Sequence, residues 1–323
     1  MQIRSVDLSD QAEWEAQVRA CGGHGLHLPG VYLADYKASA LRLWCFEIDG
    51  RVAGCALAID QARGLLGKLR GRVLLLPTAP AIASSVQAGA VREALFDYAR
   101  NLGVVRLVMQ PGFGTWITSD EDLVPFRTES ITEFVLDLSQ GYEALLAGMH
   151  KIHRKNIRRA SRAGLEVVED STLAGLLELR KMQLASSERA GEKTEGFAVR
   201  DEQYFRNVQQ HVYEPGLGTV LFARLDGEPV AALAWLKAAE RILTVRSGSV
   251  PAGYESRAMY LLHDELIRRA IDGGMVELNI GGVPSAAGEP GHAQSGLYEF
   301  KQGFGGRAMQ RYGLDIALRE VGR

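Results

Sequence analysis

The fold is decided by a stretch that occurs twice: residues 44–57 read WCFEIDGRVAGCAL, and residues 220–233 read VLFARLDGEPVAAL. Each stretch has an apolar run, the dipeptide Asp-Gly and a second apolar run. Asp-Gly between apolar runs is a strong signal for a β-hairpin, because the turn needs residues that accept a positive φ. The sequence therefore predicts one hairpin in each half of the chain.

The same order of elements follows each hairpin. In the first half, a predicted helix over 88–102 ends at Gly103 and precedes a strand over 104–109. In the second half, a predicted helix over 256–272 ends at Gly273-Gly274 and precedes a strand over 275–280. Glycine just beyond the last turn is a usual helix stop. The repeat predicts two α/β subdomains of related fold, although hairpin, helix and strand is also a common series.

The segment between the halves contains three further predicted elements. Residues 132–138 alternate like a strand, a helix over 142–163 follows Ser139, and residues 165–168 form another strand after Gly164. We place the boundary after residue 138. The predicted subdomains are therefore 1–138 and 139–323.

Composition and charge narrow the function classes. The chain has 323 residues, of which 46% are hydrophobic and 24% charged, and a net charge of −2. This is the composition of a globular protein, and any nucleic-acid contact must come from a local patch. The three cysteines fit no metal or redox spacing. The first residues lack the apolar core of a secretion signal, and no apolar run approaches the roughly 20 residues of a membrane span. We expect a cytoplasmic protein with reduced thiols.

A run of cations occurs halfway along the chain. Residues 150–162 contain no acid and six basic residues: Lys151, Arg154, Lys155, Arg158, Arg159 and Arg162. Their spacing of three or four places them on one broad helical face, where like charges repel. Contact with phosphates or RNA would offset this repulsion. A solvated face is the alternative.

A second candidate site is the stretch GLYEFKQGFGG at residues 296–306. Lys301 lies among aromatic residues just before several glycines, an arrangement that can hold a cation at the mouth of a cleft for an anionic ligand. If this stretch is extended, Glu299 points away from Tyr298 and Phe300, so we do not expect it to be a general base. His263 lies on a partly apolar helix face, and we expect it to be packed.

Three stretches resemble one known family. They are RKNIRRA at 154–160 with GLEV at 164–167, the stretch 296–306, and NIGG at 279–282. Together with the repeat, they resemble the Fem peptidoglycan aminoacyltransferases and the related tandem GNAT-like acyltransferases over roughly residues 25–315. The resemblance implies an α/β (α+β) fold of two tandem GNAT-like subdomains. Each would be a mixed, mostly antiparallel sheet flanked by helices. The long coiled-coil arm of some members is not expected here.

The resemblance also implies an activity. Fem enzymes move an amino acid from aminoacyl-tRNA to an amine on the stem peptide of a cell-wall precursor. The implied partners are aminoacyl-tRNA, as co-substrate without any further cofactor, and a nucleotide- or lipid-linked muropeptide. Peripheral contact with a membrane is compatible with such a precursor.

Residues of this chain match the family's site at several positions. Lys301 matches the catalytic lysine and Phe300 its aromatic neighbour. We expect the precursor to be bound by a set of basic, aromatic and amide residues, some matched to the family and some chosen for their chemistry: Lys37, Arg200, Tyr204, Arg246, Tyr254, Asn279 and Tyr298. We expect the tRNA to be bound by the basic helix through Lys151, Arg154, Lys155, Arg158 and Arg162.

The chain departs from the family pattern at two acidic positions. Gln110-Pro111 stands where some members have Asp-Pro, and Asn279 replaces the usual aspartate. Neither amide side chain can take a proton, so the sequence identifies no carboxylate base at these places. Positioning and charge stabilisation can still accelerate acyl transfer.

Two other functions compete with this one. An acyl-CoA-dependent N-acyltransferase, serving cell-wall or exopolysaccharide synthesis, would share the fold. Residues 248–256 (GSVPAGYES) do not spell the usual pyrophosphate loop, although a helix N-terminus can bind phosphate with other sequences. A non-catalytic module that binds a precursor or RNA is favoured by Gln110 and Asn279 and disfavoured by Lys301.

Overall fold

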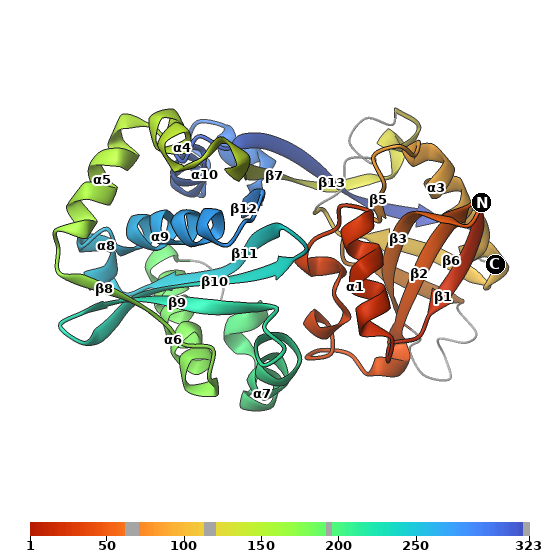
Figure 1. Cartoon of the computed structure of the whole chain (residues 1–323), viewed down its shortest axis with the longest axis horizontal. Helices are drawn as coiled ribbons and strands as arrows, with labels where there is room; N and C mark the ends of the chain where they lie inside the picture. The colour runs from red at the N-terminus through yellow and green to blue at the C-terminus, as the bar shows by residue number, and fades with distance from the viewer. Residues whose placement is uncertain (62–70, 113–120, 192–195, 319–323) are drawn as a thin grey trace.

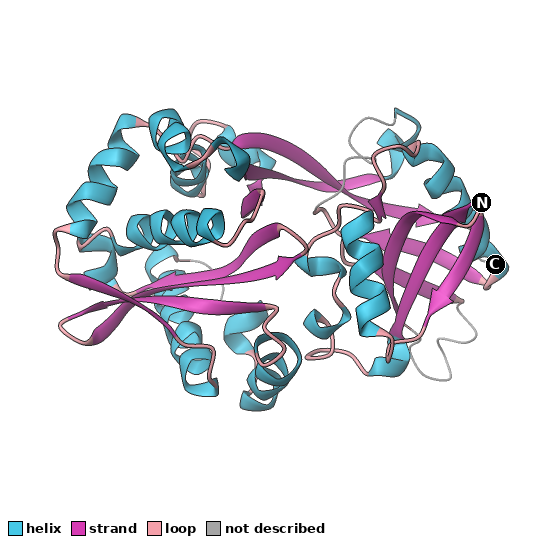
Figure 2. Ribbon diagram, viewed as in Figure 1, coloured by secondary structure: helices cyan, strands magenta, loops and turns pink. Residues whose placement is uncertain are grey.

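One β-sheet of 13 strands extends through both halves of the chain in the computed structural model, which describes residues 1–61, 71–112, 121–191 and 196–318 (Figures 1 and 2). The strand order is β1-β2-β3-β4-β6-β13-β7-β12-β11-β10-β9-β8, and β5 pairs with β3. Helices cover the sheet, as predicted for tandem GNAT-like subdomains. No described helix has the length and apolar character needed to cross a membrane.

The elements of the first half have the following bounds. The strands are β1 Gln2–Val6, β2 Leu41–Ile48, β3 Arg51–Asp60, β4 Arg72–Leu76, β5 Ala81–Ile82, β6 Val104–Met109 and β7 Arg127–Asp137. The α-helices are α1 Gln11–Ala20 and α3 Ala88–Asn101. Short 3-10 helices are η1 Gly25–His27, η2 Pro29–Val31, η3 Ala38–Ala40 and η4 Glu121–Phe126.

The second half is more helical. Its strands are β8 Leu165–Glu169, β9 Gly218–Leu225, β10 Glu228–Ala238, β11 Arg241–Ser249, β12 Glu277–Pro284 and β13 Arg307–Ala317. Its α-helices are α4 Tyr142–Gly148, α5 Lys151–Ser161, α6 Leu173–Ala190, α7 Glu202–Val208, α8 Pro251–Glu255, α9 Ala258–Asp272 and α10 Ser295–Gln302. The shorter helices are η5 Leu138–Gln140, η6 Gly196–Val199, η7 Gln209–Tyr213 and η8 Ser285–Gly288.

Both predicted hairpins are present. Strands β2 and β3 meet at Asp49-Gly50, with φ of 50° and 74°, and β9 and β10 meet at Asp226-Gly227, with φ of 53° and 85°. Two successive residues with positive φ form the type I′ turn that matches the twist of the strands. The predicted helix and strand after each hairpin are also confirmed, as α3 and β6 and as α9 and β12.

The two halves are joined by β7 and β13, which lie side by side and antiparallel (Figure 1). Strand β7 also pairs with β12, and β13 also pairs with β6. The end of β13 contributes Leu314, Ile316 and Leu318 to the core around α3. The boundary after residue 138 stays a prediction, but the last strand returns across it to the first half.

The predicted helix over 142–163 is wrong, because two helices, α4 and α5, occupy this range. Met149 and His150 between them have extended ψ values of 148° and 143°. The Met149 side chain is buried in the core, and the backbone N–H of His150 donates to the carbonyl of Gly303 at 2.9 Å. These tertiary contacts outweigh the local preference for a continuous helix.

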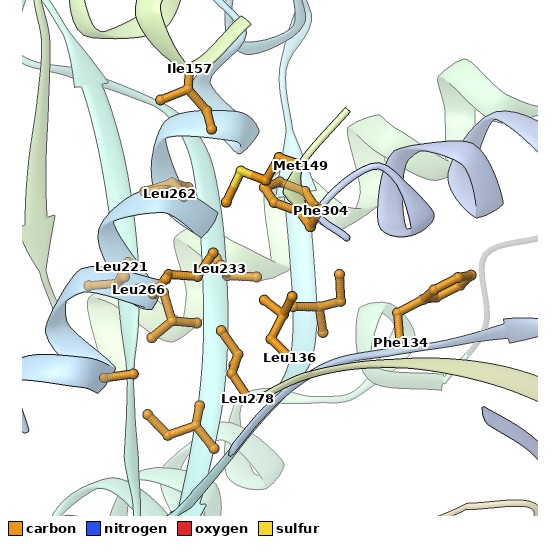
Figure 3. Packing of buried hydrophobic residues seen from close by; sticks show 14 of the residues in the cluster. Phe134, Leu136, Met149, Ile157, Leu221, Leu233, Leu262, Leu266, Leu278 and Phe304 are labelled. Atoms are coloured by element: carbon orange, nitrogen blue, oxygen red, sulfur yellow. The ribbon is translucent and has the colours of Figure 1, made fainter. Parts of the chain in front are cut away.

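The core of the second half lies between α9 and one face of its sheet. Figure 3 shows Leu262 and Leu266 of α9 packed near Leu221 and Leu233 of the strands, with Phe304 on the other side of the cluster. The opposite face of the same strands is covered by α6 and α7 (Figure 1). Both faces of this part of the sheet are therefore buried.

A contact between α5 and the end of α10 fixes the position of α10. A Cβ atom on Gly303 would lie 1.9 Å from Cε1 of His153, so only glycine leaves room for this ring. The His153 Nε2 donates to the carbonyl of Phe300 at 2.7 Å, which ties α5 to the last turn of α10. Lys301 is the next residue, so this contact also sets where its side chain begins.

We predict that Gly303→Ala lowers the free energy of unfolding by about 1–3 kcal/mol, because His153 must move and lose its hydrogen bond. Gly296→Ala is the matched control on α10, where a Cβ meets nothing within 4 Å, and it should cost nothing. Urea denaturation of both variants measures the difference. Equal stability of the two variants would contradict the described packing.

Candidate active site

A cavity of about 510 Å³ lies where β11 and β12 separate. These parallel strands are paired only from Arg241 to Leu243 and from Glu277 to Asn279, although both continue beyond these residues. The cavity is lined by β10, β11, β12, α6, η6, α9 and α10 through Leu233, Thr244, Val245, Arg246, Ser247, Ile280, Gln183, Ser187, Gly196, His263, Leu297, Phe300 and Lys301. Where paired strands part, their backbone groups become available to a ligand.

Lys301 extends from α10 into this gap. Its Nζ donates to the carbonyl of Gly282 at 3.0 Å, and a Cβ on Gly281 would lie only 3.0 Å from Nζ. Burial lowers the pKa of Lys301 to about 8, and Glu133 acts in the opposite direction. The side chain is therefore mainly an ammonium at pH 7, held in a site where its charge is poorly solvated.

The motif around Lys301 is helical rather than extended, so the argument from strand alternation does not apply to Glu299. Helix α10 places Phe300 and Lys301 at the cavity, whereas Glu299 is exposed and does not line it. Tyr298 packs edge-on against Phe134, with ring centroids 5.1 Å apart. We still do not expect Glu299 to be a base, and the reason is now its exposed position on the surface of α10.

A buried ion pair lies next to this gap. Glu133 on β7 and Arg311 on β13 are 3.2 Å apart, and their side chains are only 3% and 6% exposed. A Cβ on Gly282 would lie 3.4 Å from Cγ of Glu133, so the carboxylate arm lies against the residue that binds Lys301. Burial raises the pKa of Glu133, while Arg311 and Lys301 act to lower it. The sequence signal for this site was an acid within the otherwise uncharged strand TEFVL at residues 132–136.

His263 also lines the cavity. It is buried, as predicted, but its packed position is at the cavity wall. Its Nδ1 bonds to the carbonyl of Met259 at 2.9 Å, and its ring stacks on Phe304 with centroids 4.9 Å apart. Burial lowers the pKa of His263 to about 4, so the ring is neutral at pH 7.

Three of the predicted precursor-binding residues form one electrostatic cluster. Arg200 pairs with Asp35 at 2.6 Å, and its guanidinium lies 5.2 Å from the centre of the Tyr204 ring. Burial raises the pKa of Tyr204, with Asp35 acting the same way and Arg246 and Arg200 opposing. Arg246 also lines the cavity. Lys37 is exposed, two residues after Asp35, where the first half meets this cluster.

Tyr254 and Asn279 do not line the cavity among the described residues. The Tyr254 hydroxyl donates to Oγ of Ser186 at 3.2 Å, and the guanidinium of Arg189 lies 3.8 Å from the centre of its ring. Asn279 is fully buried, and its Oδ1 accepts from the backbone N–H of Gly281 at 2.7 Å. This bond supports the irregular end of β12, where the register with β7 shifts.

The basic helix is largely exposed. The surface of α5 carries Lys151, Lys155, Arg158 and Arg159, and the exposed Arg162 directly follows the helix. None of these five takes part in an ion pair within the described ranges. Arg154 differs, because its Nη1 donates to the carbonyls of Ala147 at 2.8 Å and Met149 at 2.6 Å. Arg154 therefore caps the C-terminal end of α4, a structural role that the sequence pattern alone did not indicate.

Gln110 is not among the described residues that line the cavity. It is exposed at the end of β6, and its backbone N–H donates to the carbonyl of Leu76. The three cysteines are free and buried, all in the first half.

Comparison with known proteins agrees with this architecture. Residues 149–302 match the model of a family described as the acetyltransferase (GNAT) domain. A crystal structure of FemX has a TM-score of 0.73 at 13% identity and covers 98% of this chain and 97% of its own. No curated protein sequence matches the chain.

The chain has a Fem-like tandem GNAT fold. Two further structures share it: L-PGS from Bacillus licheniformis, with a TM-score of 0.55 at 18% identity, and a tandem GNAT protein from the clavulanic acid biosynthesis pathway, with a TM-score of 0.55 at 13% identity. They cover 96% and 98% of this chain and 93% and 98% of their own. These structures show the fold, and the matched domain over residues 149–302 is of the acyltransferase (GNAT) kind.

We predict that Glu133→Gln lowers the pKa of Lys301 below about 8, because the nearby negative charge that favours the ammonium is lost. The variant should also lose about 3–5 kcal/mol of stability, since Arg311 then lacks its buried partner. NMR titration of labelled lysine side chains measures the pKa, with Lys301→Met assigning the signal. Glu47→Gln, in β2 of the first half, is the control. An unchanged pKa for Lys301 would refute the described electrostatics.

Proposed function

We propose that this protein transfers an amino acid from aminoacyl-tRNA to an amine on the stem peptide of a peptidoglycan precursor. The observation that carries the proposal is the Lys301 ammonium inside the cavity between β11 and β12. The reaction would belong to cell-wall synthesis in the cytoplasm. The Fem-like fold and the matched GNAT domain support acyl transfer as its class.

The cavity suits the chemistry of this step. When an amine attacks an ester carbonyl, negative charge develops on the carbonyl oxygen. A fixed ammonium in a poorly solvated site stabilises that charge more than water does. Lys301 can provide this charge, and Phe300 forms the apolar wall beside it. Removing one such donor commonly costs a factor of about 10²–10³ in rate.

The two substrates would approach by different surfaces. Arg200, Tyr204 and Arg246 gather beside Asp35 of the first half, and the exposed Lys37 follows Asp35 by two residues. Arginine can bind phosphate in bidentate fashion. We assign this cluster to the phosphates of the precursor. The exposed cations on α5 form a separate surface that makes no ion pair with any described residue, and we assign this surface to tRNA.

Acyl-CoA-dependent N-acylation is the second candidate, because residues 149–302 match the acetyltransferase (GNAT) family. Purified protein should be offered charged tRNA with a nucleotide-linked muropeptide, and separately acyl-CoA with the same acceptor. We expect product from charged tRNA. Product from acyl-CoA alone would replace the proposal with the second candidate. Product from neither would leave a module that only binds.

We predict that Lys301→Met abolishes transfer and leaves the melting temperature unchanged or higher. Methionine has a similar shape and removes a poorly solvated charge. Gln302→Ala, at the neighbouring exposed position, should keep wild-type activity. Wild-type rates for Lys301→Met would disprove the role of this residue.

We predict that the rate of transfer by the wild type falls as the pH rises through about 8, because Lys301 then loses the proton that makes it a charge donor. The pH profile of kcat should be measured with a donor ester whose spontaneous hydrolysis is subtracted. A rate that rises through pH 8 would instead make neutral Lys301 a base.

We predict that replacing Lys155, Arg158 and Arg162 together by glutamine raises KM for charged tRNA and weakens its salt dependence, with kcat little changed. Arg154 is kept, because it closes α4. Replacing three exposed cations elsewhere, Arg51, Lys181 and Lys237, keeps the change in net charge constant and should have little effect. Equal behaviour of the two triple variants would indicate a merely solvated face.

A further inference from the structure

We infer that His263 accepts the proton of the attacking amine. This inference rests on the proposed function and names its proton acceptor, a role that the amide side chains of Gln110 and Asn279 cannot fill. It rests on three observations: His263 lines the same cavity as Lys301, its ring orientation is fixed, and one ring nitrogen remains for the cavity.

The surroundings of the ring decide which nitrogen is free. The carbonyl of Met259 can only accept, so Nδ1 carries the hydrogen in their 2.9 Å bond. The neutral ring therefore keeps its lone pair on Nε2. Phe304 stacks on one face of the ring, and Phe300 meets it edge-on with centroids 5.3 Å apart. Two aromatic neighbours and one backbone bond thus hold the ring in a single orientation.

Burial and nearby charges keep His263 neutral before the reaction. Burial is the main cause of its lowered pKa, and Lys301 from α10 and His153 from α5 act in the same direction, against the hydrogen bond to Met259. Among the described residues, the cations Lys301 and Arg246 line the cavity, and both oppose the binding of an ammonium substrate. The cavity accordingly favours a neutral amine, which is the form that attacks.

The step balances with the groups already named. The amine nitrogen bonds to the carbonyl carbon, and the carbonyl oxygen becomes negative beside Lys301. The nitrogen, now positively charged and acidic, gives its proton to Nε2 of His263. The bond from the carbonyl carbon to the donor oxygen then breaks, and the electron pair leaves with that oxygen. His263 returns its proton to this leaving group. With a thioester donor, sulfur takes the place of the donor oxygen.

The experiment compares His263→Phe, which keeps an aromatic ring, with the control Asp272→Asn, at an exposed position of the same helix. We expect His263→Phe to lower kcat by about 10²–10⁴-fold with KM for both substrates little changed. Asp272→Asn should behave as the wild type. Added imidazole should restore part of kcat in His263→Ala and none in His263→Phe, where the ring fills the space.

A second measurement does not depend on activity. Long-range ¹H–¹⁵N spectra of the labelled wild type should show the His263 ring neutral at pH 7 with its hydrogen on Nδ1. A hydrogen on Nε2, or a charged ring at pH 7, would overturn the inference even if transfer from charged tRNA is confirmed. So would full kcat in His263→Phe.

The two proposals can fail separately. If the wild type uses acyl-CoA alone, the tRNA-dependent function fails, and the same variants test His263 with that donor. If the wild type uses neither donor, both proposals fail together.

Discussion

The separation of β11 from β12 is the constraint on which the rest of the site depends. The two strands pair over only three residues each and then part, and the hydrogen bond from Lys301 to the carbonyl of Gly282 lies in the gap. Helix α10 must end at this place for Lys301 to reach it. The contact of His153 with Gly303 and Phe300 secures that end. The pairing of the strands and the position of α10 therefore together place Lys301 where it can act.

This arrangement has a cost in stability, which is expected of a functional site. A lysine with its pKa lowered to about 8 is less favourable as a cation in the folded protein than in the unfolded chain. The Glu133–Arg311 pair beside it is also buried, and such pairs rarely stabilise a protein more than apolar residues of similar size would. Perturbed lysine, glutamate and histidine side chains around one cavity are a common property of active sites.

The sequence predicted the parts of the fold that local chemistry determines. Asp49-Gly50 and Asp226-Gly227 specify their turns by themselves, and Gly103 and Gly273-Gly274 marked where the following helices end. The break between α4 and α5 could not be predicted, because it depends on Gly303, far away in the chain. In the candidate site, too, some residues could be identified from the local sequence and others depend on tertiary contacts. Lys301, Phe300 and Arg246 were identified and line the cavity, whereas the role of Glu133 depends on β13 returning beside β7. The cavity position of His263 likewise depends on how α9 meets α10.

The most direct test of the central claim is a crystal structure with a phosphonate analogue that joins the acceptor amine to the acyl group through a tetrahedral phosphorus. We expect the phosphonate to bind between β11 and β12, with one of its oxygens at hydrogen-bond distance, roughly 3 Å, from Nζ of Lys301. An analogue bound elsewhere, with Lys301 still bonded only to Gly282, would show that Lys301 does not stabilise the developing charge.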